Sequence, residues 1–257
     1  MYAENPRPKK WSQEEWQLRV ELAAAYRLVE YFGWTELIYG HLTAHVPGGE
    51  PHFLINPYGL NYDEVTASNL VKIDMDGNIV EDSEYNVNEA GFVIHSAIHM
   101  RSTEENRVVM HTHTRAGMAV AALEEGLLQV SMNATSLFND IAYHDYEGPS
   151  LYLDERERLV GSLGNKHAMI LRNHGLMTVG KTVAAAFQRL YRLERACQIQ
   201  IDAGAAGNLN VISDNLAAKS GADTNAFAES EEGFGFGELE YAALMRKIDR
   251  IDASYAA

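Results

Sequence analysis

The spacing of hydrophobic and polar residues predicts a chain that alternates between helices and short strands. Ser12 and Glu15 form the sequence of a capping box, and Leu18, Leu22 and Tyr26 then recur at helical spacing. Further helical patterns cover residues 89–100, 115–125, 183–203 and 239–251. Apolar runs rich in branched side chains predict strands at residues 41–46, 52–56, 70–74, 107–115, 168–172 and 176–180.

The pattern changes near residue 220. Residues 221–238 are rich in glycine and acidic side chains, which predicts a loop before the last helix. That helix places Tyr241, Leu244, Met245 and Ile248 on one apolar face, too small to form a core alone. We therefore expect a main domain over residues 1–220, with residues 221–257 forming a loop and helix that pack on the body or on a neighbouring subunit.

Composition excludes several classes of protein. The net charge of −15 argues against a nucleic-acid partner and against binding to an anionic membrane. The single cysteine, Cys197, excludes an internal disulfide. No apolar stretch approaches the roughly 18 residues of a membrane span, and the N-terminus lacks the apolar core of a secretory signal. A cytoplasmic protein is expected.

A pair of histidines ends one predicted strand, in the segment RVVMHTHTR. Because side chains alternate along a strand, His111 and His113 point to the same side while Thr112 points to the other. Two neutral imidazoles that converge can share a cation. The alternative is an ordinary pair of core or surface histidines.

A third histidine lies between two predicted strands, in the segment NHG. Gly175 can adopt turn geometry that lets His174 project toward the strand end. Three histidines would leave a bound cation with open positions for a substrate. The alternative is that His174 is a turn residue bonded to the backbone.

Several longer segments resemble the class II aldolase/adducin family over residues 18–202. They are GHLTAHVPG, FLINPYGLNYDEVTASNLVKIDMDG, HSAIHM, VVMHTHTRAG, YHDYEG and LRNHGLMTVGKTVAAAF. The resemblance implies an α/β fold with three α/β/α layers around a mainly antiparallel central sheet. It also implies that His111, His113 and His174 hold a divalent cation, usually zinc, with manganese, cobalt or nickel as alternatives, in an enzyme that is commonly a homotetramer.

The chain departs from that family at the usual catalytic base. The family places a glutamate four residues before the histidine at position 95, and here that residue is Gly91. Glu89 is the nearest acid and is a candidate base. Its alternative role is to stabilise the start of the helix, where negative charge is favoured.

The phosphate-binding segments of the family's sugar-phosphate aldolases are also altered. His41 replaces an asparagine, and Tyr58 replaces a hydroxyl residue before Gly59. A bulky tyrosine there argues against a sugar phosphate, and His41 is a candidate acid or base. Arg115 and Arg172, on either side of the histidine motifs, could each bind a carboxylate through two hydrogen bonds, or form surface ion pairs instead.

Together these features predict a metal-dependent lyase, an aldolase or decarboxylase, that acts on a small non-phosphorylated hydroxy, keto or aromatic carboxylate. Both reactions need a cation that accepts the charge left when a carbon–carbon bond breaks. The alternative is a non-catalytic binding or scaffolding domain like that of adducin. The three histidines argue against this alternative, because adducin-type domains lack them.

Overall fold

The computed structural model describes residues 8–100, 103–148, 152–229 and 233–257. Its strands form one seven-stranded sheet in the order β3-β2-β1-β4-β7-β6-β5. The strands are β1 (His41–His45), β2 (Phe53–Ile55), β3 (Val71–Ile73), β4 (Val108–Thr112), β5 (Ile141–His144), β6 (Ala168–Leu171) and β7 (Gly175–Gly180). Neighbouring strands are antiparallel except for β5 and β6, so the predicted antiparallel sheet is confirmed.

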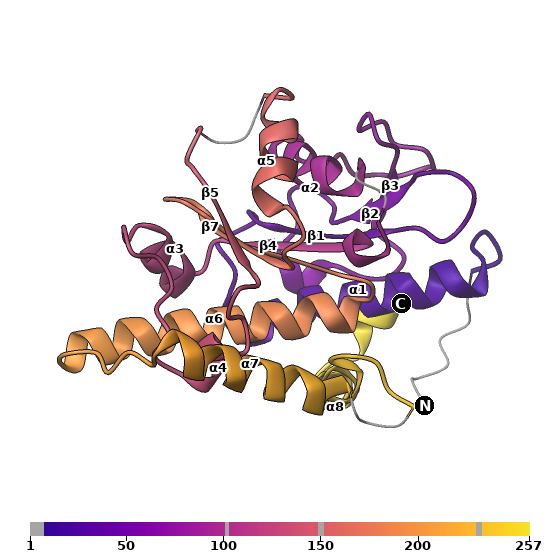
Figure 1. Ribbon diagram of the computed structural model, residues 1–257. Helices are drawn as coiled ribbons and strands as arrows, with labels where there is room; N and C mark the ends of the chain where they lie inside the picture. The colour runs from indigo at the N-terminus through magenta and orange to yellow at the C-terminus, as the bar shows by residue number, and fades with distance from the viewer. Residues whose placement is uncertain (1–7, 101–102, 149–151, 230–232) are drawn as a thin grey trace.

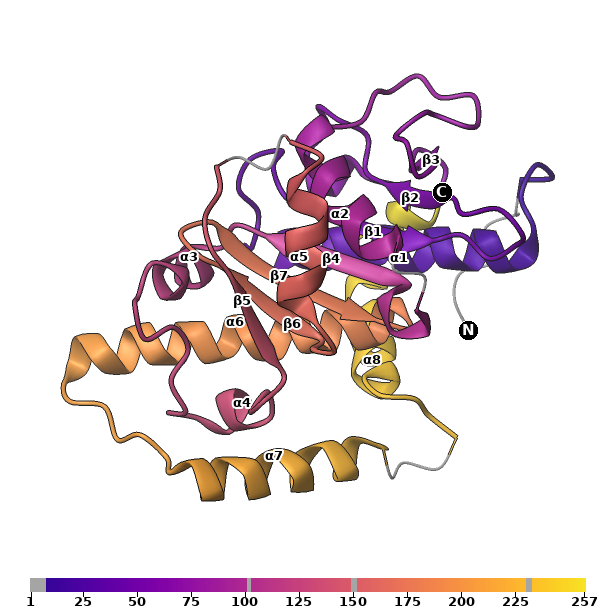
Figure 2. The same ribbon diagram turned by 45° about the horizontal axis from the view of Figure 1, so that its top comes forward.

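Helices cover both faces of this sheet, which gives the expected three layers (Figure 1). The helices are α1 (Gln13–Tyr31), α2 (Glu89–Met100), α3 (Arg115–Ala121), α4 (Met132–Thr135), α5 (Glu155–Leu163), α6 (Val183–Ala206), α7 (Asp214–Glu229) and α8 (Glu238–Asp249). Helices α2 and α5 lie on one face, and α1, α6 and α8 lie on the other (Figures 1 and 2).

Alternation along the central strand β4 assigns its residues to the two faces. Val108 and Met110 belong to the core beneath α1 and α6, whereas Val109 belongs to the core beneath α2 and α5. Because side chains alternate, His111 shares the α2 face with Val109. His41 pairs with His111 across the two strands and so lies on the same face.

The structure corrects several of the helix and loop boundaries expected from the sequence. A tight turn at Asp76-Gly77 follows β3, where Gly77 has a φ of 89° and its N–H donates to the carbonyl of Asp74. The expected loop over residues 221–238 is wrong for residues 221–229, which belong to α7. Residues 230–232 lie outside the described part. Strand β5 was not predicted, although the segment YHDYEG contributes its last residues. The helix expected over 115–125 ends at Ala121.

The last helix packs on the body of the same chain. Tyr241, Met245 and Ile248 are buried in the core shared with α1 and α6, and the Tyr241 hydroxyl donates to the carbonyl of Glu21. The division of the chain near residue 220 stays a prediction. None of the described helices is long and apolar enough to cross a membrane.

A buried arginine on α1 contacts the chain on both sides of β3. Arg19 is fully buried, and its guanidinium contacts the carboxylates of Glu15 and Glu81 and donates to the carbonyl of Leu70. Lys72 adds a second cation 2.8 Å from Glu15. A buried guanidinium is tolerated because each of these oxygens replaces lost water.

We predict that Arg19→Met destabilises the protein by about 3–5 kcal/mol, because Glu15 and Glu81 would lose a buried cationic partner. Urea unfolding monitored by circular dichroism measures the change. Arg250→Met, at an exposed arginine, is the control and should change stability by less than about 0.5 kcal/mol. Equal effects of the two substitutions would contradict the structural role of Arg19.

Candidate metal centre

Three histidines from two separate segments of the chain meet where β4 ends and β7 begins, near the middle of the sheet. His111 is on β4, His113 follows the end of that strand, and His174 lies in the turn between β6 and β7. One ligand nitrogen from each ring lies within 4.8 Å of the other two. The structure thus brings together the three residues that the sequence singled out.

Hydrogen bonds orient the rings. Nδ1 of His111 lies 2.9 Å from the carbonyl oxygen of Leu176, and because a carbonyl can only accept, this nitrogen carries the proton. Nε2 of His111 is therefore left with its lone pair, and it lies 2.8 Å from Nε2 of His113. A backbone carbonyl bonded to the outer ring nitrogen is the usual way that proteins fix a metal-binding histidine.

The close approach of the two segments depends on Gly175. A Cβ atom on this residue would lie 2.5 Å from the carbonyl oxygen of Thr112 and 3.1 Å from the ring of His113. The expectation that Gly175 supplies unusual turn geometry is wrong: the left-handed residue is Asn173, with a φ of 56°. Gly175 is required because it lacks a side chain.

Burial keeps the three imidazoles in their neutral form. It lowers the pKa of His174 to about 4, with further contributions from His113 and His144. Burial also lowers the pKa of His113, and it lowers that of His111 well below the usual value. Neutral imidazoles have the lone pairs that a metal ligand needs.

This donor set fits a divalent cation such as zinc. Tetrahedral zinc binds imidazole nitrogens at about 2.0–2.1 Å, which places two ligand nitrogens roughly 3.3 Å apart. The spacing of the three histidines brackets this value. Without a cation, Nε2–H of His113 can donate to Nε2 of His111 across this 2.8 Å contact, and a bound cation would replace that proton. Three protein ligands leave at least one position for water or substrate.

His41 lies beside this centre and is buried, with 5% of its surface exposed. Burial, with the nearby rings of His113 and His174, lowers the pKa of His41 to about 3. Nδ1 of His95 lies 2.7 Å from the hydroxyl of Thr43. That hydroxyl is also 2.7 Å from His99.

The acid proposed as a base occupies the start of a helix. Glu89 is the first residue of α2, which agrees with a helix-start position, but its side chain lies outside the described part of the structure. Its role as base or cap therefore stays a prediction. Gly91 lies two residues further into the first turn, against the ring of His41.

The two candidate arginines differ in whether their guanidinium groups already have partners within the protein. Arg172 donates to the carbonyls of Leu123 and Glu124 and stacks on Tyr143, so its guanidinium already has structural partners. Arg115 is exposed and lines a cavity of about 600 Å³ with Glu194.

The loop with the altered phosphate segment is open to solvent. Tyr58 is 43% exposed, and Gly59 has a φ of 101°, which favours glycine although the surrounding space is free. The roles of Tyr58, Gly59, Arg115 and Arg172 in substrate binding stay predictions.

Two further residues lie near the centre, and the sequence assigned a role to neither. The carboxylate of Glu36 is close enough to favour the charged form of His113. The ring of Tyr146 lies 6.5 Å from that of His174. Both residues are exposed and lie between regular elements, so nothing in the hydrophobic pattern singles them out.

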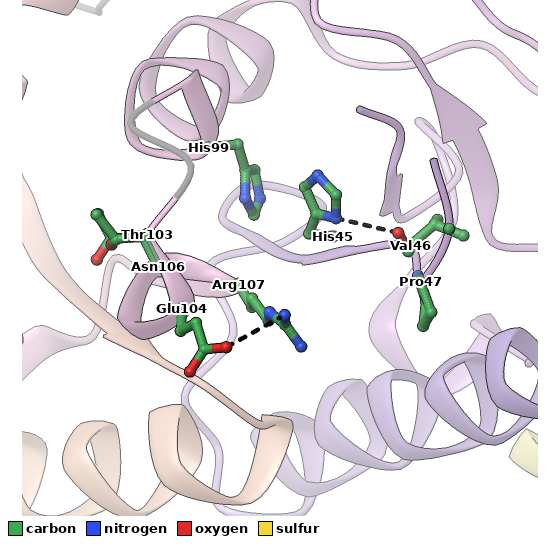
Figure 3. A pocket seen from close by; sticks show the side chains of 9 residues that line it. His45, Val46, Pro47, His99, Thr103, Glu104, Asn106 and Arg107 are labelled. Atoms are coloured by element: carbon green, nitrogen blue, oxygen red, sulfur yellow. Dashed lines mark hydrogen bonds and ion pairs between the residues drawn. The ribbon is translucent and has the colours of Figure 1, made fainter. Parts of the chain in front are cut away.

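A separate cavity of about 300 Å³ lies at the other end of β1 (Figure 3). His45 and His99 line it, together with an ion pair between Arg107 and Glu104 at 3.8 Å. This cavity does not include the three histidines of the metal centre, and we assign it no part in the chemistry.

Comparison with known families agrees with the geometry. Residues 20–201 match the model of the class II aldolase and adducin N-terminal domain. The chain belongs to this class II aldolase/adducin family.

Both aldolases and adducins occur among the proteins that this chain resembles. An aldolase II superfamily protein from Pseudomonas syringae has 48% sequence identity and a TM-score of 0.88, with 96% of this chain and 98% of that chain covered. An L-fuculose 1-phosphate aldolase from Glaciozyma antarctica PI12 has 29% identity and a TM-score of 0.82, with 97% and 96% covered. Alpha-adducin of Mus musculus is 43% identical over 91% of this chain, which spans only 33% of that longer protein. The shared fold therefore does not by itself decide between catalysis and binding.

The buried histidines predict a loss of stability in acid. Burial, with nearby His45, lowers the pKa of His99 to about 3, whereas in the unfolded chain the pKa is about 6.5. As the pH falls below 6.5, the unfolded chain gains a proton that the folded chain does not, so stability decreases until the folded pKa is reached. His99→Gln should reduce this slope by up to about 1.4 kcal/mol per pH unit.

Urea unfolding of metal-free protein at pH 7.5, 6 and 5 measures this slope. His52→Gln, at a histidine outside the buried Thr43 network, should keep the wild-type slope. An unchanged slope in His99→Gln would show that other groups cause the acid sensitivity.

Proposed function

We propose that this protein is a divalent-metal-dependent lyase that cleaves a carbon–carbon bond by retro-aldol reaction or decarboxylation. The observation that carries the proposal is the convergence of His111, His113 and His174, buried enough to stay neutral and oriented by the carbonyl of Leu176. A bound cation would accept the negative charge left on substrate oxygen when the bond breaks. Zinc suits the three-nitrogen donor set, with manganese, cobalt or nickel as alternatives.

The substrate we propose is small and carries a carboxylate instead of a phosphate. Tyr58 lies in the loop where the family's aldolases bind phosphate. The guanidinium of Arg115 is exposed and forms no ion pair with another of the described residues. Arg115 could thus pair with a substrate carboxylate. Gly91 offers no carboxylate base, which favours decarboxylation, a reaction that needs no initial proton abstraction. The net charge of −15 supports a small-molecule substrate rather than nucleic acid, and we propose a cytoplasmic enzyme.

The alternative is a non-catalytic binding domain, and the similarity to alpha-adducin favours it. The two functions differ in what they require of the histidines. A lyase needs a bound cation, whereas a scaffold needs only the fold.

We predict about one zinc per chain after purification, and a large loss of zinc in His113→Ala, because two imidazoles bind it far more weakly than three. Elemental analysis of extensively dialysed protein measures the ratio. His52→Ala, outside the centre, should keep full zinc content. Full occupancy in His113→Ala would contradict the assigned ligands, and wild type without zinc or zinc-dependent stabilisation would favour the scaffold.

The same proteins can be used to find the reaction. Zinc-loaded wild type and His113→Ala are incubated with 2-keto acids, hydroxy acids and aromatic carboxylates, and released carbon dioxide and aldehyde are measured. Release by wild type that is lost with zinc in His113→Ala would support the lyase.

We also propose that the chain forms a homotetramer. Exposed apolar side chains lie close to the metal centre, where a second subunit could cover them: Leu37, next to Glu36, is 73% exposed and Tyr146 is 56% exposed. We predict a mass of about four chains by light scattering at micromolar concentration. A mass of 28.6 kDa, that of a single chain, would contradict the assembly.

A further inference from the structure

The ring of His41 occupies a slot on the helix that faces the metal centre. A Cβ atom at Gly91 would lie 2.6 Å from both Cδ2 and Nε2 of His41. Contacts this short essentially do not occur, so the ring can lie here only because residue 91 is glycine. His95, one helical turn further along α2, lies edge-on to His41 with ring centroids 5.8 Å apart. Gly91 and His95 thus form two sides of the slot.

This slot is held in place by a buried hydrogen-bond network. The hydroxyl of Thr43, two residues after His41 on β1, lies 2.7 Å from Nδ1 of His95 and 2.7 Å from Nε2 of His99. Both histidines are on α2, so one hydroxyl fastens two turns of this helix to the strand that carries His41. The position of the His41 ring is consequently fixed from both sides.

His41 also lies on the side of the sheet that carries the metal ligands. It is directly opposite His111 in the pairing of β1 with β4, and directly opposite residues in antiparallel strands place their side chains on the same face. Within the described residues, neither ring nitrogen of His41 has a hydrogen-bond partner, although the side chain is 5% exposed. Buried polar atoms without a protein partner are rare and indicate a bound water or ligand.

The nitrogen atoms of His41 are not within the group of three that could share one cation. The ring is therefore placed to contact a molecule bound to the cation instead of the cation itself. A buried imidazole without a carboxylate partner is neutral, and a neutral ring carries one N–H donor. Such a donor can bind an anionic oxygen without repelling a neighbouring cation.

We infer that His41 hydrogen-bonds the oxygen of a substrate held at the three-histidine centre, and that Gly91 is present to make room for it. The ligand class is an anion that binds a cation through two neighbouring oxygens, as an α-hydroxy or α-keto carboxylate does. This inference rests on the proposed metal-dependent function and adds the residue that would select the substrate oxygen.

The packing of the slot can be tested without metal. Gly91→Ala should lower the melting temperature, although alanine is favoured in helices, because its Cβ meets the His41 ring. Gly161→Ala in α5 is the matched control, since nothing lies within 4 Å of an added Cβ there, and it should raise the melting temperature. In a His41→Ala background the clash is absent, so Gly91→Ala should become neutral or stabilising. Destabilisation that persists in this background would overturn the slot.

Binding is tested by titrating oxalate into zinc-loaded protein in a calorimeter, because oxalate offers two neighbouring anionic oxygens. His41→Ala should keep full zinc content and lose about tenfold or more in oxalate affinity, the usual effect of removing a hydrogen bond to a charged group. His41→Gln keeps an N–H donor and should recover part of the affinity. Gly91→Ala should weaken oxalate binding with His41 still present, because the ring is displaced.

The outcomes separate this inference from the proposed function. A wild-type protein that binds no zinc would overturn the proposed function. Normal zinc content with equal oxalate affinity in wild type and His41→Ala would overturn only the role of His41. Loss of zinc in His41→Ala would overturn it as well by making His41 a ligand, and so would zinc-loaded wild type that does not bind oxalate.

Discussion

The metal centre depends on the close contact between the start of β7 and the end of β4. Gly175 lies so near the carbonyl of Thr112 that no side chain fits between them. This contact brings His174 to the two histidines of β4 and places the Leu176 carbonyl where it fixes the proton on His111. The geometry of the site is thus set by a backbone approach, which explains how histidines about 60 residues apart can be held in one arrangement.

The same burial that keeps these histidines neutral is expected to reduce the stability of the protein in acid. Removing imidazoles from water disfavours their charged form, so the lone pairs stay available for a cation. A second pair on the same face, His95 and His99, forms hydrogen bonds with the hydroxyl of Thr43. Burial lowers the pKa values of these two histidines as well. The α2 face is thus a histidine-rich layer whose imidazoles are held in the neutral form by burial.

Membership of a family that includes aldolases and adducins gives the fold but not the reaction. This chain combines a three-histidine cluster with a histidine at position 41 and a glycine at position 91. These last two residues are physically linked, because the ring of one fills the space next to the other. A cation held by three neutral imidazoles, with Gly91 where the family has a glutamate, would keep more of its positive charge. Such a centre would favour anionic substrates.

The sequence alone predicted the same-side placement of His111 and His113, because strand alternation is a short-range property, and it left His174 open between a ligand and a turn residue. The layered fold and the set of three ligands followed from the resemblance of longer segments to the class II aldolase/adducin family. The sequence did not reveal β5 or α7, since polar and glycine-rich composition obscured their periodicity. It also could not show that His41 touches Gly91, or that Gly175 matters for space and not for turn geometry. These contacts join residues from different elements, and only the pairing of β1 with β4 and the packing of α2 on the sheet decide which side chains meet.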